Sequence, residues 1–127
     1  MKKVIDIYGE SSGSTSEASI SLTVNGETGK SYYTIPQGWK LKIYEVDAWG
    51  KGETLFRVRV GTDTATLTNN PARIGFNLAS KGQLMRTFRM PLIIEATSSD
   101  LYVFVTLIQP SAVDAGIELH GELERLA

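Results

Sequence analysis

The chain has 127 residues, a formal net charge of −1 and no cysteine. A chain of this length is expected to form one domain and to bury roughly two-thirds of its unfolded surface. The charge balance does not indicate nucleic acid as a partner, and the lack of cysteine excludes disulfides and thiolate metal sites. No segment approaches the ~20 apolar residues of a membrane span. The apolar part of the N-terminus is too short for a signal peptide, so we expect a soluble protein made in the cytoplasm.

The N-terminal 17 residues predict a short strand followed by a tether. Residues 2–8 are rich in Val and Ile, whereas residues 10–17 are rich in serine and contain no apolar side chain. That composition is typical of a flexible segment. We therefore expect an N-terminal strand and flexible arm in residues 1–17, which serves assembly, and a single β-sandwich domain in residues 18–127.

Two strands and a turn are predicted next. Residues 18–24 alternate between apolar and polar side chains without a fault, which predicts a half-buried strand. Residues 31–35 are β-forming, and Pro36-Gln37-Gly38 then suits a type I turn.

The following strand changes its apolar parity. Trp39, Leu41 and Ile43 share one face, and then the apolar positions move to Tyr44, Val46 and Ala48. A strand whose parity changes carries a bulge or buries both faces. We predict a bulge near residues 43–45.

The second half of the chain predicts more strands, at residues 56–60, 65–68, 74–78, 84–96 and 101–108. Pro91 cannot donate a ladder hydrogen bond, so residues 84–96 are expected at a sheet edge or a bend. Residues 117–126 alternate like a strand, although Leu119, Leu123 and Leu126 also fit a helix face. Gly121 would weaken a helix by about 1 kcal/mol, which favours the strand.

Together these segments predict an all-β fold of about eight to ten short strands. Turn signals recur along the chain, and no helix is predicted with the same strength. This spacing is typical of an antiparallel β-sandwich of the jelly-roll type.

Two short motifs resemble catalytic signatures but lack their context. Gly29-Lys30-Ser31 matches the end of a phosphate-binding loop, but β-forming residues follow where a helix is needed. Residues 9–13 match G-x-S-x-G, but the alternating strand from Ala18 excludes the helix of a nucleophile elbow. Neither motif predicts an activity.

The only histidine, His120, shares its strand face with Glu118 and Glu122. Such a group could hold a cation, but a solvated face is the commoner outcome, and removing the imidazole is expected to cost under roughly 1 kcal/mol. Glu45 and Asp47 lie two apart on a strand, as many unreactive acid pairs do. We therefore predict no catalytic, cofactor-binding or metal-binding residue and no cofactor.

The aromatic residues are the strongest candidates for a binding function. Aromatic side chains on a sandwich face can stack on sugars or anchor a protein partner, although packing in the core is an alternative. The candidate partner or glycan contacts are Tyr32, Trp39, Tyr44 and Trp49. Cross-strand or intersubunit ion pairs could also join Arg57, Arg59, Arg73, Arg86 and Arg89 to Glu118, Glu122 and Glu124.

Residues 34–43, TIPQGWKLKI, resemble the "I/V-P-x-G-x-x-L-x-I" entry of small β-sandwich proteins of viruses and phages. Residues 91–95 and 101–105 are similar to the closing strands of single jelly-roll virion proteins. The resemblance covers about half of the chain and rests mainly on turn chemistry. It implies a structural protein of a virion, usually a homo-oligomer, and transfers no site residue.

We therefore expect a non-enzymatic, capsid-associated subunit: a minor capsid, decoration or attachment protein located in the virion. Its expected partners are further copies of itself, with a trimer favoured, and other virion proteins. Nucleic acid and a membrane are not expected partners. The alternative is a carbohydrate-binding β-sandwich module that uses its Trp and Tyr side chains to bind a glycan.

Overall fold

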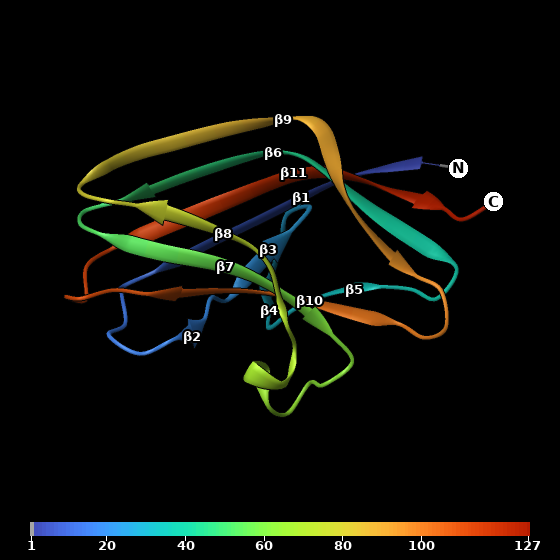
Figure 1. Cartoon of the computed structure of the whole chain (residues 1–127), viewed down its shortest axis with the longest axis horizontal. Coiled ribbons are helices and arrows are strands. Elements are labelled where there is room, and N and C mark those ends of the chain that lie inside the picture. Colours follow the sequence, from blue (N-terminus) through green and yellow to red (C-terminus); the bar gives the residue numbers. More distant parts are fainter. Residues whose placement is uncertain (1) are drawn as a thin grey trace.

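The computed structural model describes residues 2–127 and shows two antiparallel sheets packed face to face (Figure 1). The strands are β1 (Lys2–Ser11), β2 (Ala18–Ser19), β3 (Leu22–Val24), β4 (Glu27–Lys30), β5 (Tyr33–Ile35), β6 (Trp39–Gly50), β7 (Thr54–Gly61), β8 (Ala72–Leu78), β9 (Gly82–Ala96), β10 (Leu101–Ile108) and β11 (Ala115–Arg125). One short 3-10 helix (Leu67–Asn69) lies between β7 and β8. The predicted all-β sandwich is confirmed. Within residues 2–127, no helix is long and apolar enough to cross a bilayer.

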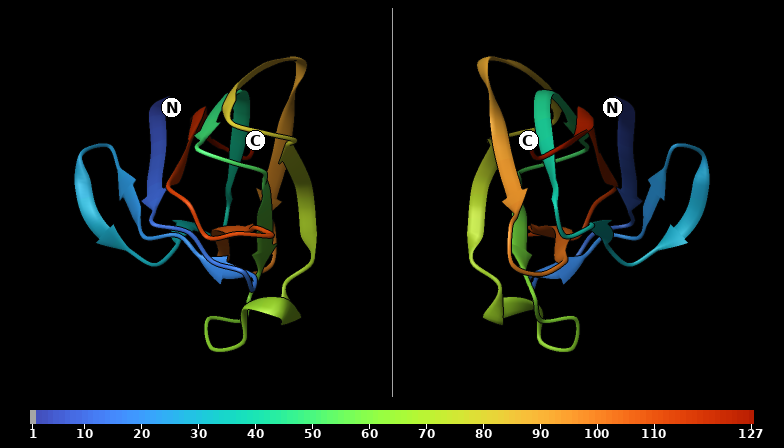
Figure 2. Two further views of the ribbon diagram at one scale, coloured as in Figure 1. Left: turned by 90° about the vertical axis from the view of Figure 1, so that its left-hand side faces the viewer. Right: turned by 90° about the vertical axis from the view of Figure 1, so that its right-hand side faces the viewer.

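The strand order is that of a jelly roll with one added hairpin. The larger sheet has the order β4-β3-β1-β11-β6-β9, and the smaller has β2-β10-β7-β8, with β5 also paired to β10. Successive strands therefore alternate between the sheets, apart from two pairs. The β3–β4 hairpin extends the larger sheet beyond β1, and β7 and β8 both lie in the smaller sheet. Figure 2 shows this hairpin projecting from one side of the sandwich. It makes β9 and β4 the two edges of the larger sheet.

The core lies between the two sheets and is built by strict alternation. In β7, for example, Phe56 and Val58 are fully buried while Arg57 and Arg59 point outward. From the other sheet, Ile7 of β1 and Leu119 of β11 enter the same core. Apolar burial between the two inner faces is thus the main stabilising interaction.

Residues 2–11 differ from the separate strand and arm that the sequence predicts. β1 pairs with β11 along its whole length and with β3 on its other side, and Ile5 and Ile7 are buried. The serine-rich segment after β1 is also fixed, because the backbone N–H of Ser14 donates to Gln109 and the Ser14 carbonyl accepts from the Gln109 N–H. The alternating apolar side chains of β1 place this strand in the sandwich. Gln109, which is distant in the sequence, fixes the serine-rich segment.

The predicted strand at residues 18–24 is divided by a change of sheet. β2 pairs with β10 in the smaller sheet, and β3 pairs with β1 in the larger. Ile20 lies at the crossing and is buried. This division contributes to a total of eleven strands within residues 2–127, slightly more than expected. The predicted strand at residues 65–68 is wrong, since the 3-10 helix forms there.

The predicted bulge in β6 is confirmed. Ile43 pairs with Gly121 and Glu45 with His120, so Tyr44 is the extra residue. Next to the bulge the backbones of β6 and β11 approach closely: a Cβ on Gly121 would lie 2.2 Å from the backbone carbonyl oxygen of Lys42. Only glycine fits there without a shift of the backbone.

Two further sequence predictions are confirmed by β9 and β11. β9 is an edge strand, and its pairing with β6 jumps from Leu92 to Thr87, so that residues 88–91 bend out around Pro91. Residues 115–125 form a strand, β11, at the centre of the larger sheet. The jump in β9 gives this edge an irregular outline.

The contact at Gly121 leads to a stability prediction. Gly121→Ala is expected to lower the free energy of unfolding by about 3 kcal/mol, because the new methyl group collides with a backbone atom that cannot rotate away. Urea denaturation measures this change. Gly75→Ala is the matched control, since a Cβ there would lie 3.5 Å from its nearest neighbour, and it should cost less than about 1 kcal/mol. Equal effects of the two substitutions would contradict the prediction.

Candidate functional site

The four aromatic residues singled out from the sequence do not form one site. Trp39 packs against the core, and its ring lies 5.6 Å from the guanidinium of Arg125. Tyr44 and Trp49 lie on the outer face of the larger sheet, where the Tyr44 hydroxyl donates to Glu122. Tyr32 lies on the smaller sheet against Tyr102 and Phe104, with ring centroids 4.9 and 5.3 Å away.

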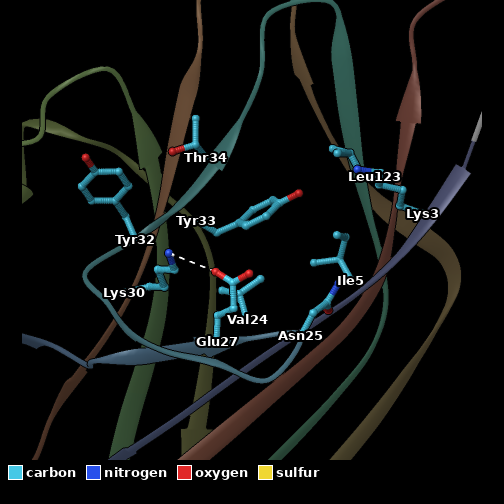
Figure 3. Close-up of a pocket in the computed structure, with 10 residues that line it drawn as sticks. All are labelled: Lys3, Ile5, Val24, Asn25, Glu27, Lys30, Tyr32, Tyr33, Thr34 and Leu123. Atoms are coloured by element: carbon cyan, nitrogen blue, oxygen red, sulfur yellow. Dashed lines mark ion pairs between the residues drawn. The ribbon is translucent and has the colours of Figure 1, made fainter.

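A pocket of about 350 Å³ lies between β1, the β3–β4 hairpin and β5 (Figure 3). Tyr33 extends across it, and burial raises the pKa of the Tyr33 hydroxyl to about 12. Its apolar walls include Ile5 and Val24, while Lys30 and Glu27 form an ion pair at its rim. Of the four predicted aromatic contacts, only Tyr32 lines this pocket. Its residues are Lys3, Ile5, Val24, Asn25, Glu27, Lys30, Tyr32, Tyr33, Thr34 and Leu123.

On the outer face of the larger sheet, the structure surrounds His120 with four carboxylates. We call this group, made of His120, Asp6, Glu45, Asp47 and Glu118, the His120 cluster. The Nδ1 atom lies 2.8 Å from Asp6 Oδ1, and Nε2 lies 3.1 Å from Asp47 Oδ2. Glu118 and Glu45 lie 3.5 and 3.7 Å from Nε2. Three strands, β1, β6 and β11, contribute to it.

The bulge in β6 is what brings Glu45 and Asp47 to this face. Leu41 and Ile43, before the extra residue, point into the core, so a regular strand would direct Glu45 inward as well. The inserted Tyr44 reverses the parity, and both acids then lie outside, beside the histidine. Sequence reasoning paired His120 with Glu118 and Glu122, but Glu122 instead accepts a hydrogen bond from Tyr44.

The electrostatics of the cluster favour a protonated histidine. Burial, the largest single influence, lowers the pKa of His120, but the hydrogen bonds with Asp6 and Asp47 and the nearby charges outweigh it and raise the pKa. An imidazolium has two N–H donors, one for each of these carboxylates. Two groups of three residues have the spacing of cation ligands. One consists of Asp6, Glu118 and His120, and the other of Glu45, Asp47 and His120. The protonated His120 ring already supplies the positive charge at the centre of these carboxylates, so we assign no metal ion to the His120 cluster.

A second charged cluster lies on the smaller sheet and contains a residue that sequence reasoning placed in the flexible arm. Glu17 accepts hydrogen bonds from Arg59 at 2.6 Å, Arg57 at 3.0 Å and Thr106 at 2.7 Å. The bonds from Arg59, the largest influence, lower the pKa of the Glu17 carboxyl to about 2. Arg57 and Arg59 therefore pair with Glu17 and not with the C-terminal acids. This cluster joins the loop before β2 to β7 and β10 and has a structural role.

The edge at β9 presents unpaired charge and exposed apolar side chains together. We call Arg73, Lys81, Arg86 and Arg89, with Met85, Met90 and Ile93, the β9 edge. Met85 is 72% and Met90 81% exposed. Arg73 reaches from β8 to the Ile93 carbonyl oxygen at 3.3 Å, so β8 contributes to the same surface. These residues come from consecutive strands of different sheets and the turn between them, so only the topology brings them to one surface.

No protein-family model and no curated protein matches the chain. Among solved structures, the chain is similar to a subunit of the disulfide-linked pili that form Bacillus endospore appendages, with 12% identity, 99% of this chain and 89% of the other covered, and a TM-score of 0.54. It also matches the cyanophage Pam1 capsid, with 14% identity, 99% of this chain and 86% of the other covered, and a TM-score of 0.43. A CBM4 protein matches with 12% identity, 98% of this chain and 92% of the other covered, and a TM-score of 0.38. The first similarity shows the fold alone. TM-scores below 0.5 indicate no shared function.

The Glu17 cluster predicts acid-sensitive stability. Glu17→Gln is expected to lower the free energy of unfolding by about 2 kcal/mol at pH 7, because two guanidinium groups lose their counter-charge. The folded pKa of about 2 lies below the ordinary 4.5, so the stabilisation is present above pH 4.5 and is lost as the pH falls towards 2. Thermal unfolding across this range measures the difference. Glu53→Gln, an exposed control, should behave like wild type at every pH.

The His120 cluster predicts the opposite pH dependence. The folded pKa of His120 is raised, so its stabilisation is present below the ordinary 6.5 and is lost as the pH rises through the folded value. His120→Gln should therefore cost about 1 kcal/mol at pH 5.5 and less at pH 8.5. Denaturant unfolding at the two pH values tests this. A larger loss at the higher pH would show that the imidazole is held neutral.

Proposed function

We propose that this protein is a non-enzymatic structural subunit that acts through protein–protein assembly, as a capsid-associated component of a virion. The observation that carries the proposal is the β9 edge, a fifteen-residue strand at the end of the larger sheet with strongly exposed methionines. An exposed edge strand offers unpaired backbone groups to another chain. Apolar side chains on the same strand favour burial against a partner.

Three further features support an assembly role. The fold is shared with a pilus subunit, and the chain resembles jelly-roll virion proteins at residues 91–95 and 101–105. The only histidine lies on an open sheet face and does not line the pocket at Tyr33. We propose that the partners are other copies of this chain, with a trimer favoured, and other proteins of the particle. Minor capsid, decoration and attachment roles all fit such a subunit.

A carbohydrate-binding module is the second candidate, and the pocket at Tyr33 is the observation that favours it. Two tyrosines and several polar groups line a pocket large enough for a sugar ring, which is a common arrangement for small ligands. Calorimetric titration with mono- and oligosaccharides distinguishes the two candidates, because Trp39 and Trp49 lie outside the pocket and their fluorescence is not a direct reporter. Saturable binding that Tyr33→Ala abolishes would favour the carbohydrate function.

The assembly proposal predicts the molar mass in solution. Light scattering at tens of micromolar protein should give a multiple of the 13.9 kDa chain, and three copies are expected. A closed ring of identical subunits gives a mass that stays constant on further concentration. A mass of one chain throughout this range would contradict the proposal.

A further inference from the structure

Among residues 2–127, the four cations of the β9 edge have no carboxylate partner. Residues 64–94 contain four cations and no Asp or Glu, an acid-free stretch of about a quarter of the chain. Among residues 2–127, no carboxylate lies within 4.0 Å of Arg73, Lys81, Arg86 or Arg89, whereas Arg57 and Arg59 both contact Glu17. The edge therefore presents a positive charge that its own chain leaves unneutralised.

Exposed apolar side chains lie on the same strand as two of these cations, Arg86 and Arg89. Within residues 2–127, four large apolar residues are strongly exposed, and three of them, Met85, Met90 and Ile93, belong to β9. Single exposed apolar residues are normal on a protein surface, but a concentration on one strand is typical of an interface. A partner for this edge must therefore offer both acidic groups and protein surface.

The same chain carries an acidic surface that fits this requirement. The net charge of −1 is the sum of +4 from the four cations of the β9 edge and −5 from the rest. In the His120 cluster, four carboxylates surround one imidazole, so even a protonated ring leaves three negative charges. Their side chains are 32–50% exposed and can be reached from outside.

An edge cannot bind the acidic surface of its own molecule. Met85 and Thr87 lie on the outer face beside the cluster, where Thr87 donates to Glu45. Side chains alternate along a strand, so Arg86 points to the other face, away from these acids. Arg89 lies in the segment that bends out of the pairing, at residues 88–91.

We propose that the β9 edge of one molecule docks onto the His120 cluster of a second copy of this chain. This contact rests on the proposed assembly function and names its partner surfaces. It joins two different surfaces, so the first molecule keeps a free acidic face and the second keeps a free edge. Contacts of this kind repeat from head to tail and close into a ring when the rotation allows, which is the geometry of a trimer.

Two other arrangements fit the surface less well. Pairing of two β9 edges with each other would bring arginines against arginines, and the bend at residues 88–91 interrupts the ladder of hydrogen bonds. A nucleic acid would neutralise the cations through its phosphates, but it would leave the methionines without an apolar partner and would be repelled by the acidic face. A second copy satisfies both the charges and the apolar side chains.

The test is a charge exchange between the two surfaces. R86E/R89E takes the charge of the four edge positions from +4 to 0, and E45K/E118K converts two of the four carboxylates of the acidic face to cations. Each double variant alone should lose association in light scattering, because the altered surface no longer attracts its partner surface. An equimolar mixture should regain association as a one-to-one pair, in which the unaltered edge of E45K/E118K meets the unaltered acidic face of R86E/R89E. Association of wild type should weaken as the salt concentration rises.

K3E/K30E is the matched control, because it changes the net charge by the same amount on the opposite side of the larger sheet and should leave association intact. Thermal unfolding of each variant shows that it is folded. If wild type assembles and R86E/R89E assembles equally well, or if the mixture stays dissociated, this contact is wrong while the assembly function stands. If wild type is monomeric under all conditions, both fail. If a DNA duplex retains monomeric wild type but does not retain R86E/R89E, the β9 edge is a nucleic-acid surface and the proposal is overturned.

Discussion

The close approach of Gly121 to the Lys42 carbonyl oxygen is the constraint on which the outer face of the larger sheet depends. This close approach accommodates the extra residue Tyr44. The extra residue reverses which positions of β6 face the core and which face outward. Before the bulge the apolar side chains of β6 enter the core, and after it the same strand still buries Val46 while sending Glu45 outward. One inserted residue thus preserves the core and also creates the acidic surface around His120.

The sequence predicts features that depend on neighbours along the chain. The parity change in β6 and the position of Pro91 are local signals, and they identify the bulge and the edge strand correctly. The sequence fails where distant residues decide the outcome. Glu17 lies in a segment with no apolar side chain, so its composition indicates a tether, yet Arg57, Arg59 and Thr106 hold it from two other strands. No local pattern carries that information.

The candidate site shows the same limit. Residue type singled out four aromatic side chains, but the structure distributes them over the core and two opposite faces. Conversely, the acids of the His120 cluster come from three strands, and Asp6 is 114 residues away from His120 in the sequence. Strand order decides which outward positions become neighbours, and the alternation within a strand cannot reveal it.

The acid-free stretch of residues 64–94 was visible in the sequence, but its meaning depends on topology. In a jelly roll, β8 and β9 are consecutive strands at the same side of opposite sheets, so their charges gather at one edge. Basic side chains, a proline and a bend are also the devices by which edge strands avoid uncontrolled pairing. These devices block pairing between identical edges but leave the edge open to an acidic surface. The features that prevent aggregation therefore also select the partner, and the His120 cluster supplies the matching charge on the same chain.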